Sequence, residues 1–227
     1  MTITYQIRDK KGKIVAKSKE KITIPAQSEQ VHKTKLSFKN PRLWHGRVAP
    51  YLYNIKVSVS QNGKVIDRFT AKQGFRFFRV DGQKGFFLNG KSYQLWGINR
   101  HQDHQDKGWA LSKKDHDLDI AIIDEMGTRA IRLAHYPHAE YFFQQCDKKG
   151  ILVTAELPIV DTVRNTPEVT ENTTLQMNEI IDMYGNNTSV FAYGLYNELY
   201  HRSSDDASAL LKNLHDLCKK RDPNRLT

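Results

Sequence analysis

Glu198 stands at the end of an apolar stretch that is typical of a buried β-strand. The stretch VFAYGLY, residues 190–196, runs directly into Asn197 and Glu198. Burying such a pair without partners is costly, so Glu198 is either a structural acid held by a neighbour or an ionisable group that the fold presents. We favour the second interpretation. A Glu at the end of an apolar strand needs partners or a raised pKa, and a raised pKa is what a general acid needs near neutral pH.

Three earlier apolar stretches also end in polar side chains. Residues 93–98 run into NRHQDH, residues 130–133 contain an arginine and run into AHYPH, and residues 151–155 run into a glutamate. Any one histidine could be a structural group, and Arg132 could form a buried ion pair with Glu156. Four polar strand ends together indicate a shared site. Its candidate residues are His101, Asp103, Arg132, His135, Glu156, Asn197 and Glu198.

Helical patterns separate these four strands. Ser112 and Asp115 resemble an acidic capping box that begins a helix ended by Gly127. The apolar face of this helix is expected to consist of Leu118, Ala121, Ile122 and Met126. Three further helices are indicated by apolar stripes within residues 139–146, 177–184 and 207–218, the last capped by Ser203 or Ser204. Four βα units in a row predict that residues 86–227 form the first half of a (β/α)8 TIM barrel, in which the carboxyl ends of the strands meet at one face.

The first third of the chain alternates apolar and polar residues as β-strands do. We expect strands over residues 3–9, 13–24, 31–38, 52–60 and 64–71, with a hairpin turn at Asn62-Gly63. Short antiparallel strands at this spacing predict a β-sandwich over residues 1–73, incomplete at its N-terminus. A linker over residues 74–85 is expected to join it to the half-barrel.

Composition and charge exclude several classes of function. The 227 residues carry 35 Lys and Arg against 25 Asp and Glu, a net charge of +10. The basic residues are scattered, with clusters at RDKKGK and KSKEK near the start that we interpret as solvated turns, so we expect no nucleic-acid partner. No apolar run reaches the roughly 20 residues of a membrane span, and no signal peptide follows Met1. We therefore expect no membrane association and a cytoplasmic location, with Cys146 and Cys218 as buried reduced thiols rather than a disulfide.

Four motifs, in order, resemble those of glycoside hydrolase family 2, the family of β-galactosidases, β-glucuronidases and β-mannosidases. They are GFRFFRVDGQKGFFLNGKSYQLWGINRHQD, AIRLAHYPH, ILVTAELP and VFAYGLYNEL. The resemblance covers nearly the whole chain and implies that the sandwich is immunoglobulin-like and precedes the barrel. It implies an O-glycosyl hydrolase that acts on a carbohydrate without a cofactor, and it leaves a homo-oligomer of the whole enzyme open.

The resemblance also implies a role for each candidate residue. Glu198 matches the general acid/base, and Asn197 matches the residue that hydrogen-bonds the sugar 2-hydroxyl. His135 matches a histidine that stabilises the transition state, and Arg132 matches an arginine that orients carboxylates. His101 and Asp103 match residues that contact sugar hydroxyls, and Glu156 matches an acidic residue beneath the acid/base.

The sequence departs from the family pattern in ways that limit these expectations. No Glu follows Glu198, so the nucleophilic carboxylate of a retaining mechanism is not in this chain, and we expect the chain alone to be inactive. The stretch LPIVDTV after Glu156 lacks the Glu and His with which some relatives hold Mg²⁺, so we expect no metal site. The leading substrate is a terminal β-D-galactoside, with a β-glucuronide or another family 2 β-glycoside as the alternative.

Two other classes of function stay open as alternatives. The imidazoles of His101, His104, His135 and His138, together with Glu156, could bind a metal ion in a metal-dependent barrel hydrolase. The spacing in HQDH is not the His-x-His of a strand-borne pair, which argues against this. The chain could instead be a non-catalytic fragment, either sugar-binding or unstable, because half a barrel exposes open sheet edges.

Overall fold

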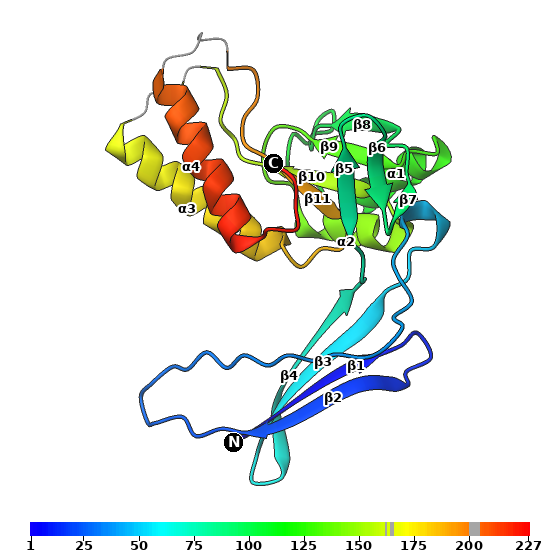
Figure 1. The fold of residues 1–227 in the computed structure, drawn as a ribbon, viewed down its shortest axis with the longest axis vertical. Helices are drawn as coiled ribbons and strands as arrows, with labels where there is room; N and C mark the ends of the chain where they lie inside the picture. The colour runs from blue at the N-terminus through cyan, green and yellow to red at the C-terminus, as the bar shows by residue number, and fades with distance from the viewer. Residues whose placement is uncertain (162, 164–165, 200–204) are drawn as a thin grey trace. The chain divides into compact units, whose positions relative to one another are not determined.

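The computed structural model of the protein describes residues 1–161, 163, 166–199 and 205–227 (Figure 1). The chain divides into two compact units. Unit 1 consists of residues 1–44 and 51–75, and unit 2 consists of residues 45–50 and 76–227.

Unit 1 is built on a four-stranded antiparallel sheet with the strand order β2-β1-β3-β4. The strands are β1 (Thr2–Arg8), β2 (Ile14–Lys21), β3 (Tyr53–Gln61) and β4 (Lys64–Gln73). Asn62 and Gly63 join β3 to β4 with φ angles of 51° and 79°, the left-handed conformation that a tight hairpin turn requires, so the predicted turn is confirmed.

The apolar face of this sheet carries the core of unit 1. Ile7, Tyr51 and Tyr53 are buried there, and Leu36 and Phe38 pack against them. The segment 31–38 was expected to be a strand, but it does not form one. Its alternation therefore reflects which side chains are buried, and not a backbone ladder with a neighbouring strand.

After residue 75, unit 2 first forms a small antiparallel sheet whose strands the sequence did not predict. Its strands, in the order β5-β6-β7, are β5 (Phe78–Asp81), β6 (Gly85–Leu88) and β7 (Lys91–Ser92). The interval 74–85, expected to be a linker, thus contains β5. Four residues are too few for alternation to stand out, but the Asp81 carboxylate accepts from the N–H groups of Gln83 and Lys84 and closes the β5–β6 turn.

The rest of unit 2 is a parallel sheet with the order β11-β10-β9-β8, as four successive βα units predict. The strands are β8 (Gly97–Arg100), β9 (Ala130–Leu133), β10 (Leu152–Glu156) and β11 (Val190–Gly194). The helices are α1 (Lys113–Glu125), α2 (Glu140–Lys149), α3 (Pro167–Tyr184) and α4 (Asp205–Arg221). Strand β8 lies further along the chain than the expected 93–98, whereas the other three strands match within two residues.

The helix ends follow the chemistry of their residues. The N–H of Ser112 donates to the Asp115 carboxylate at the start of α1, and Gly150 ends α2 with a φ angle of 78°. The predicted caps at Ser203 and Ser204 lie outside the described residues. Helices α3 and α4 run side by side (Figure 1), and Arg221 of α4 donates to Asn178 of α3.

The predicted apolar face of α1 is wrong. The helix buries His116, Ile120 and Ile123, whereas Leu118 and Ile122 are exposed. Both sets have helical spacing, and the register of α1 against the sheet decides which set is covered. The stripe of α3 is buried as predicted, with Met177, Ile180, Ile181 and Tyr184 in the core of unit 2.

Cys146 and Cys218 are both buried free thiols, as predicted. Burial raises the pKa of Cys218 to about 11, so its thiol is protonated near neutral pH. Among the described residues, no helix combines the length and the apolar character that crossing a membrane requires.

Candidate active site

Arg132 is the centre of a polar cluster at the carboxyl ends of the parallel strands. It lies on β9, and its Nε and Nη2 donate to the Glu156 carboxylate, at the end of β10, over 2.8 and 2.6 Å. Nη2 also donates over 3.0 Å to Oδ1 of Asn197, three residues after β11. Glu156 is only 2% exposed, so a paired cation is what makes its burial tolerable.

His135 and His101 extend this cluster. Nδ1 of His135 lies 3.3 Å from Oε1 of Glu156. The ring of His101 meets the ring of His135 edge-on, with centroids 4.9 Å apart. Asp103 is exposed in the loop after β8 and makes no hydrogen bond or ion pair with the cluster among the described residues. The structure thus joins His101, Arg132, His135, Glu156 and Asn197 in one cluster, and Asp103 lies outside it.

Glu198, the predicted acid/base, follows Asn197 directly and has a φ angle of 44°. This left-handed conformation is uncommon for a residue other than glycine, and it turns the chain sharply at the end of the strand segment. Glu198 is exposed, so the shielded environment that we expected around it is not formed by the described residues. The pKa of Arg132 is raised, chiefly by its hydrogen bond to Glu156 and further by the negative charges of Glu156 and Glu198. The charge of Glu198 therefore contributes to the electrostatic environment of Arg132.

Gly194 makes room for Glu156, and sequence reasoning missed this role. A Cβ atom on Gly194 would stand 2.7 Å from Cγ and 2.9 Å from Oε2 of Glu156. The two residues are register partners in the β10–β11 pair. A glycine in a strand that neighbours the strand carrying a candidate site residue is the signal that could have indicated it.

A second buried network is centred on Arg100, the last residue of β8. Arg100 donates to Asp119 from Nε over 2.9 Å and to Nδ1 of His138 over 2.9 Å. Because a guanidinium only donates, Nδ1 of His138 is the acceptor, and its Nε2–H donates to the Ala134 carbonyl over 3.2 Å. Burial lowers the pKa of His138 to about 3, so this imidazole is neutral.

An aromatic pair borders the histidines and was also missed. Trp109 is 63% exposed and stacks on Tyr136, with ring centroids 4.4 Å apart. The Tyr136 ring approaches that of His101 at 6.0 Å, and its hydroxyl accepts from the N–H of Gln102 over 3.0 Å. A tryptophan in the largely polar segment between a strand and a helix was the available signal.

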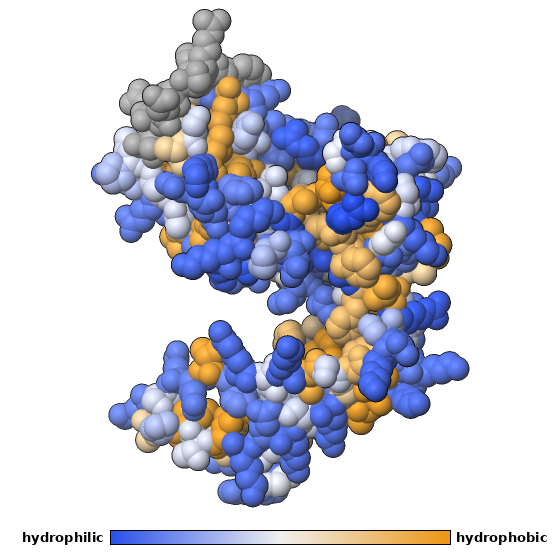
Figure 2. Space-filling model, in the orientation of Figure 1, coloured by the Kyte–Doolittle hydropathy of each residue, from blue (hydrophilic) through white to orange (hydrophobic). Residues whose placement is uncertain are grey.

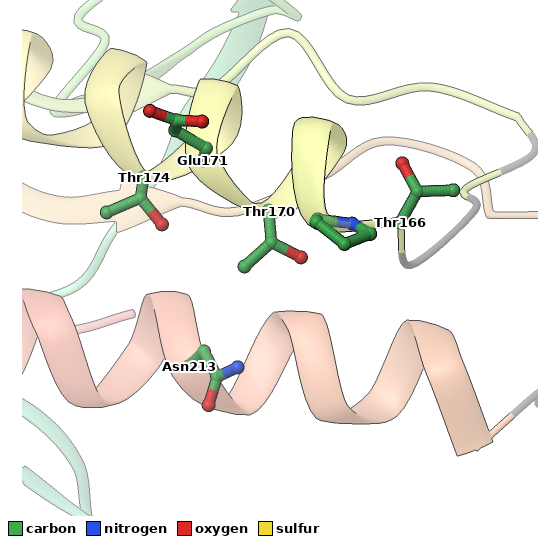
Figure 3. Close-up of a pocket in the computed structure, with 6 residues that line it drawn as sticks. Thr166, Thr170, Glu171, Thr174 and Asn213 are labelled. Atoms are coloured by element: carbon green, nitrogen blue, oxygen red, sulfur yellow. The ribbon is translucent and has the colours of Figure 1, made fainter.

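Two hollows among the described residues of unit 2 bear on the site. One, of about 290 Å³, is lined by Asn99, Arg132 and Thr154, among others, and so adjoins the polar cluster. Oγ1 of Thr154 is buried and has no hydrogen-bond partner among the described residues. The other, of about 520 Å³, lies between α3 and α4 and includes none of the predicted site residues (Figure 3). Its lining includes Thr166, Thr170, Glu171, Thr174 and Asn213.

Two of the four histidines of the metal-hydrolase alternative are held by other partners, whereas His135 and His101 lie beside Glu156. His104 bonds to Asp119 over 2.9 Å, and His138 is held by Arg100. Across the residues that the structure describes, no group of three or more His, Cys, Asp and Glu is arranged to hold a metal ion.

Family models match almost the entire chain. The model of the TIM barrel domain of glycosyl hydrolases family 2 matches residues 78–227, and the model named glycosyl hydrolases family 2 matches residues 1–76. A β-glucuronidase of Bacteroides fragilis is 36% identical over 95% of this chain. A β-galactosidase of Bacteroides ovatus is 30% identical over 90% of it. The chain spans 32% and 25% of the lengths of these two relatives.

The solved structures agree with the sequence matches. The crystal structure of a Bacteroides uniformis β-glucuronidase covers 99% of this chain with a TM-score of 0.91 and 31% identity, and the chain covers 28% of that protein. The expected fold, a partial immunoglobulin-like β-sandwich followed by half of a (β/α)8 TIM barrel, is thereby confirmed. The chain belongs to family 2 of the glycosyl hydrolases.

Proposed function

We propose that the protein hydrolyses terminal β-glycosides by a retaining double displacement, and that this chain supplies the acid/base half of the site. The observation that carries the proposal is the contact of Arg132 with both Glu156 and Asn197 at the strand ends, with Glu198 next in the chain. A glycosidase needs such a cluster of carboxylates and fixed donors around one sugar ring.

In the proposed mechanism, Glu198 protonates the glycosidic oxygen while a second carboxylate attacks the anomeric carbon. The two carboxyl groups of a retaining site stand about 5–5.5 Å apart. Glu198 then deprotonates the water that releases the sugar. Because Oδ1 of Asn197 accepts from Arg132, its amide Nδ2 is oriented to donate, which suits a sugar hydroxyl. Arg132 also holds Glu156 in place.

For the sugar, we propose a β-D-galactoside first and a β-D-glucuronide second. The first follows from the RHQD and RLAHYP motifs, and the second is favoured by the 36% identity to a protein named β-glucuronidase. Hydrolysis of p-nitrophenyl β-galactoside and p-nitrophenyl β-glucuronide distinguishes the two, because the preferred sugar has the higher kcat/KM.

The role of Glu198 is tested in a hybrid in which residues 1–227 are joined to the remainder of the Bacteroides fragilis relative. We expect Glu198→Gln to lower kcat by about 10²–10⁴ on alkyl glycosides, whose leaving groups need a proton, and by much less on p-nitrophenyl glycosides. The exposed Glu125→Gln is the matched control and should leave both rates unchanged. A near-wild-type rate of Glu198→Gln on alkyl glycosides contradicts the assignment.

The 227-residue chain by itself is expected to bind a methyl β-glycoside weakly without turning it over, since it contains no Glu after Glu198. Saturation-transfer NMR measures this binding, and Asn197→Ala should weaken it. Turnover that Glu198→Gln abolishes in the isolated chain would mean that a carboxylate within this chain acts as the nucleophile.

A further inference from the structure

Unit 1 carries the entire net charge of the protein. Its residues include 15 Lys and Arg against 4 Asp and Glu, a net charge of +11, while the whole chain has +10. The remainder is therefore close to neutral. A charge asymmetry of this size between two units indicates an anionic partner for one of them.

The basic residues of unit 1 gather on one face of its sheet because of the strand register. Thr2 of β1 pairs with Lys21 and Ser60, Thr4 pairs with Lys19 and Ser58, and Gln6 pairs with Lys17 and Lys56. Ser58 pairs with Arg68 of β4, and Asn54 with Lys72. Side chains alternate between faces along a strand, so these partners share one face. We define the basic face as Lys17, Lys19, Lys21, Lys56, Arg68 and Lys72.

Acidic residues are absent from this face in unit 1, all of whose residues are described. Glu20 pairs with Ile3 on the opposite face, where Ser18, His32 and Thr34 bond to its carboxylate. Asp67 pairs with Val59, also on that face. No ion pair joins any side chain of the basic face to a carboxylate of unit 1. The positive charges of the face are thus uncompensated within the unit.

Hydroxyl groups fill the middle of the basic face. A hollow of about 520 Å³ lies there, and its lining includes Thr2, Thr4, Lys19, Lys21, Ser58 and Ser60. Lys17, Lys19 and Lys21 are exposed and stand in a row about 14 Å long at the usual rise of a strand. Hydrophilic side chains cover much of the visible surface of unit 1 (Figure 2).

We propose that the basic face of unit 1 binds an anionic polysaccharide. Lysines supply charge for the carboxylate or sulfate groups of such a chain, and the threonine and serine hydroxyls donate to and accept from its sugar hydroxyls. The basic face carries no aromatic side chain on which a nucleobase could stack, and unit 1 contains no helix to enter a DNA groove. This inference does not depend on the hydrolytic function of unit 2.

The test measures binding of the 227-residue protein to immobilised polygalacturonate and dextran sulfate at 50–200 mM salt. We expect binding to both or to one of them, with affinity falling steeply as salt rises, as for other contacts made by several charges. The triple variant Lys17→Glu, Lys19→Glu, Lys21→Glu should weaken binding by about tenfold or more. Far-UV circular dichroism checks that the variant keeps its fold.

A second triple variant is the matched control, since it changes the net charge equally. It replaces Lys33, Lys35 and Lys39 by Glu; these exposed lysines flank Leu36 and Phe38, which cover the opposite, apolar face. We expect it to weaken binding by less than about threefold. Equal losses in the two triple variants overturn the proposal, since net charge alone would then explain binding. Absence of binding to both polysaccharides, or tighter binding to duplex DNA or to phosphatidylserine vesicles, overturns it as well.

Discussion

Replacing Gly194 by alanine should disrupt the candidate site through one carboxylate. The new Cβ would stand 2.7 Å from Cγ of Glu156, closer than real Cβ contacts allow. Glu156 is 2% exposed and bound to Arg132 by two hydrogen bonds, so it has little room to swing aside. Alanine at this position must therefore push the carboxylate off Arg132 or push β10 and β11 apart.

The cost follows from which of these contacts is lost. Breaking a buried ion pair costs about 3–5 kcal/mol, and overpacking costs about 1–3 kcal/mol. Because Arg132 is 37% exposed and keeps part of its hydration, we expect Gly194→Ala to cost about 2–3 kcal/mol. Gly82→Ala is the control, since its Cβ would meet nothing within 4 Å, and it should change stability by less than about 0.5 kcal/mol.

A double-mutant cycle with Glu156→Ala decides whether the carboxylate is the cause. Once the Glu156 side chain is gone, the methyl group introduced by Gly194→Ala has space, and its added cost should fall below about 0.5 kcal/mol. Hydrogen exchange of the peptides covering β10 and β11 measures these differences locally, which avoids assuming that both units unfold in one step. The same cost for Gly194→Ala with and without the Glu156 side chain would refute the explanation.

Two further predictions concern buried groups of unit 2. His138 has a folded pKa of about 3, below the 6.5 of an exposed imidazole, so it stabilises the fold fully above pH 6.5 and loses this effect as pH falls. The free energy of unfolding, measured in urea, should fall by about 1.4 kcal/mol for each pH unit between about pH 6 and pH 4, and His138→Gln should flatten that slope. The Asp147 carboxylate accepts hydrogen bonds from the backbone N–H of Ser189 and from the side-chain amide of Asn187. In the same assay, Asp147→Ala should lower the free energy of unfolding by about 2–4 kcal/mol, and Asp147→Asn should lower it clearly less. Equal losses in the two variants would contradict the acceptor role.

The parallel sheet and its site were predictable because chain topology places strand ends together. Arg132 and Glu156 are 24 residues apart, yet each belongs to a βα unit, and consecutive units put both side chains at one edge of the sheet. The caps of α1 and α2 were predictable too, because each depends only on residues close together in the chain. Ser112 bonds to Asp115 at the start of α1, and Gly150 ends α2 in the left-handed conformation. These features depend on local chemistry or on an order of elements that the chain itself displays.

The remaining features depend on contacts that no local pattern encodes. The two candidate stripes of α1 have the same spacing, and only packing against the sheet selects Ile120 and Ile123. The role of Gly194 requires knowing that Glu156 is its register partner. The stack of Trp109 on Tyr136 joins two loops whose conformations the sequence does not determine separately.

The contacts of Arg132 have a consequence for how the site responds to a ligand. The same guanidinium bonds to residues from the segments that end β10 and follow β11, and it is itself carried by β9. These three segments cannot separate without breaking the hydrogen bonds of Arg132 to Glu156 and Asn197. Their side chains therefore lose their conformational entropy during folding and not during binding. The polar cluster is therefore ordered before any ligand binds, and at the proposed site a sugar would meet donors that need no reorientation.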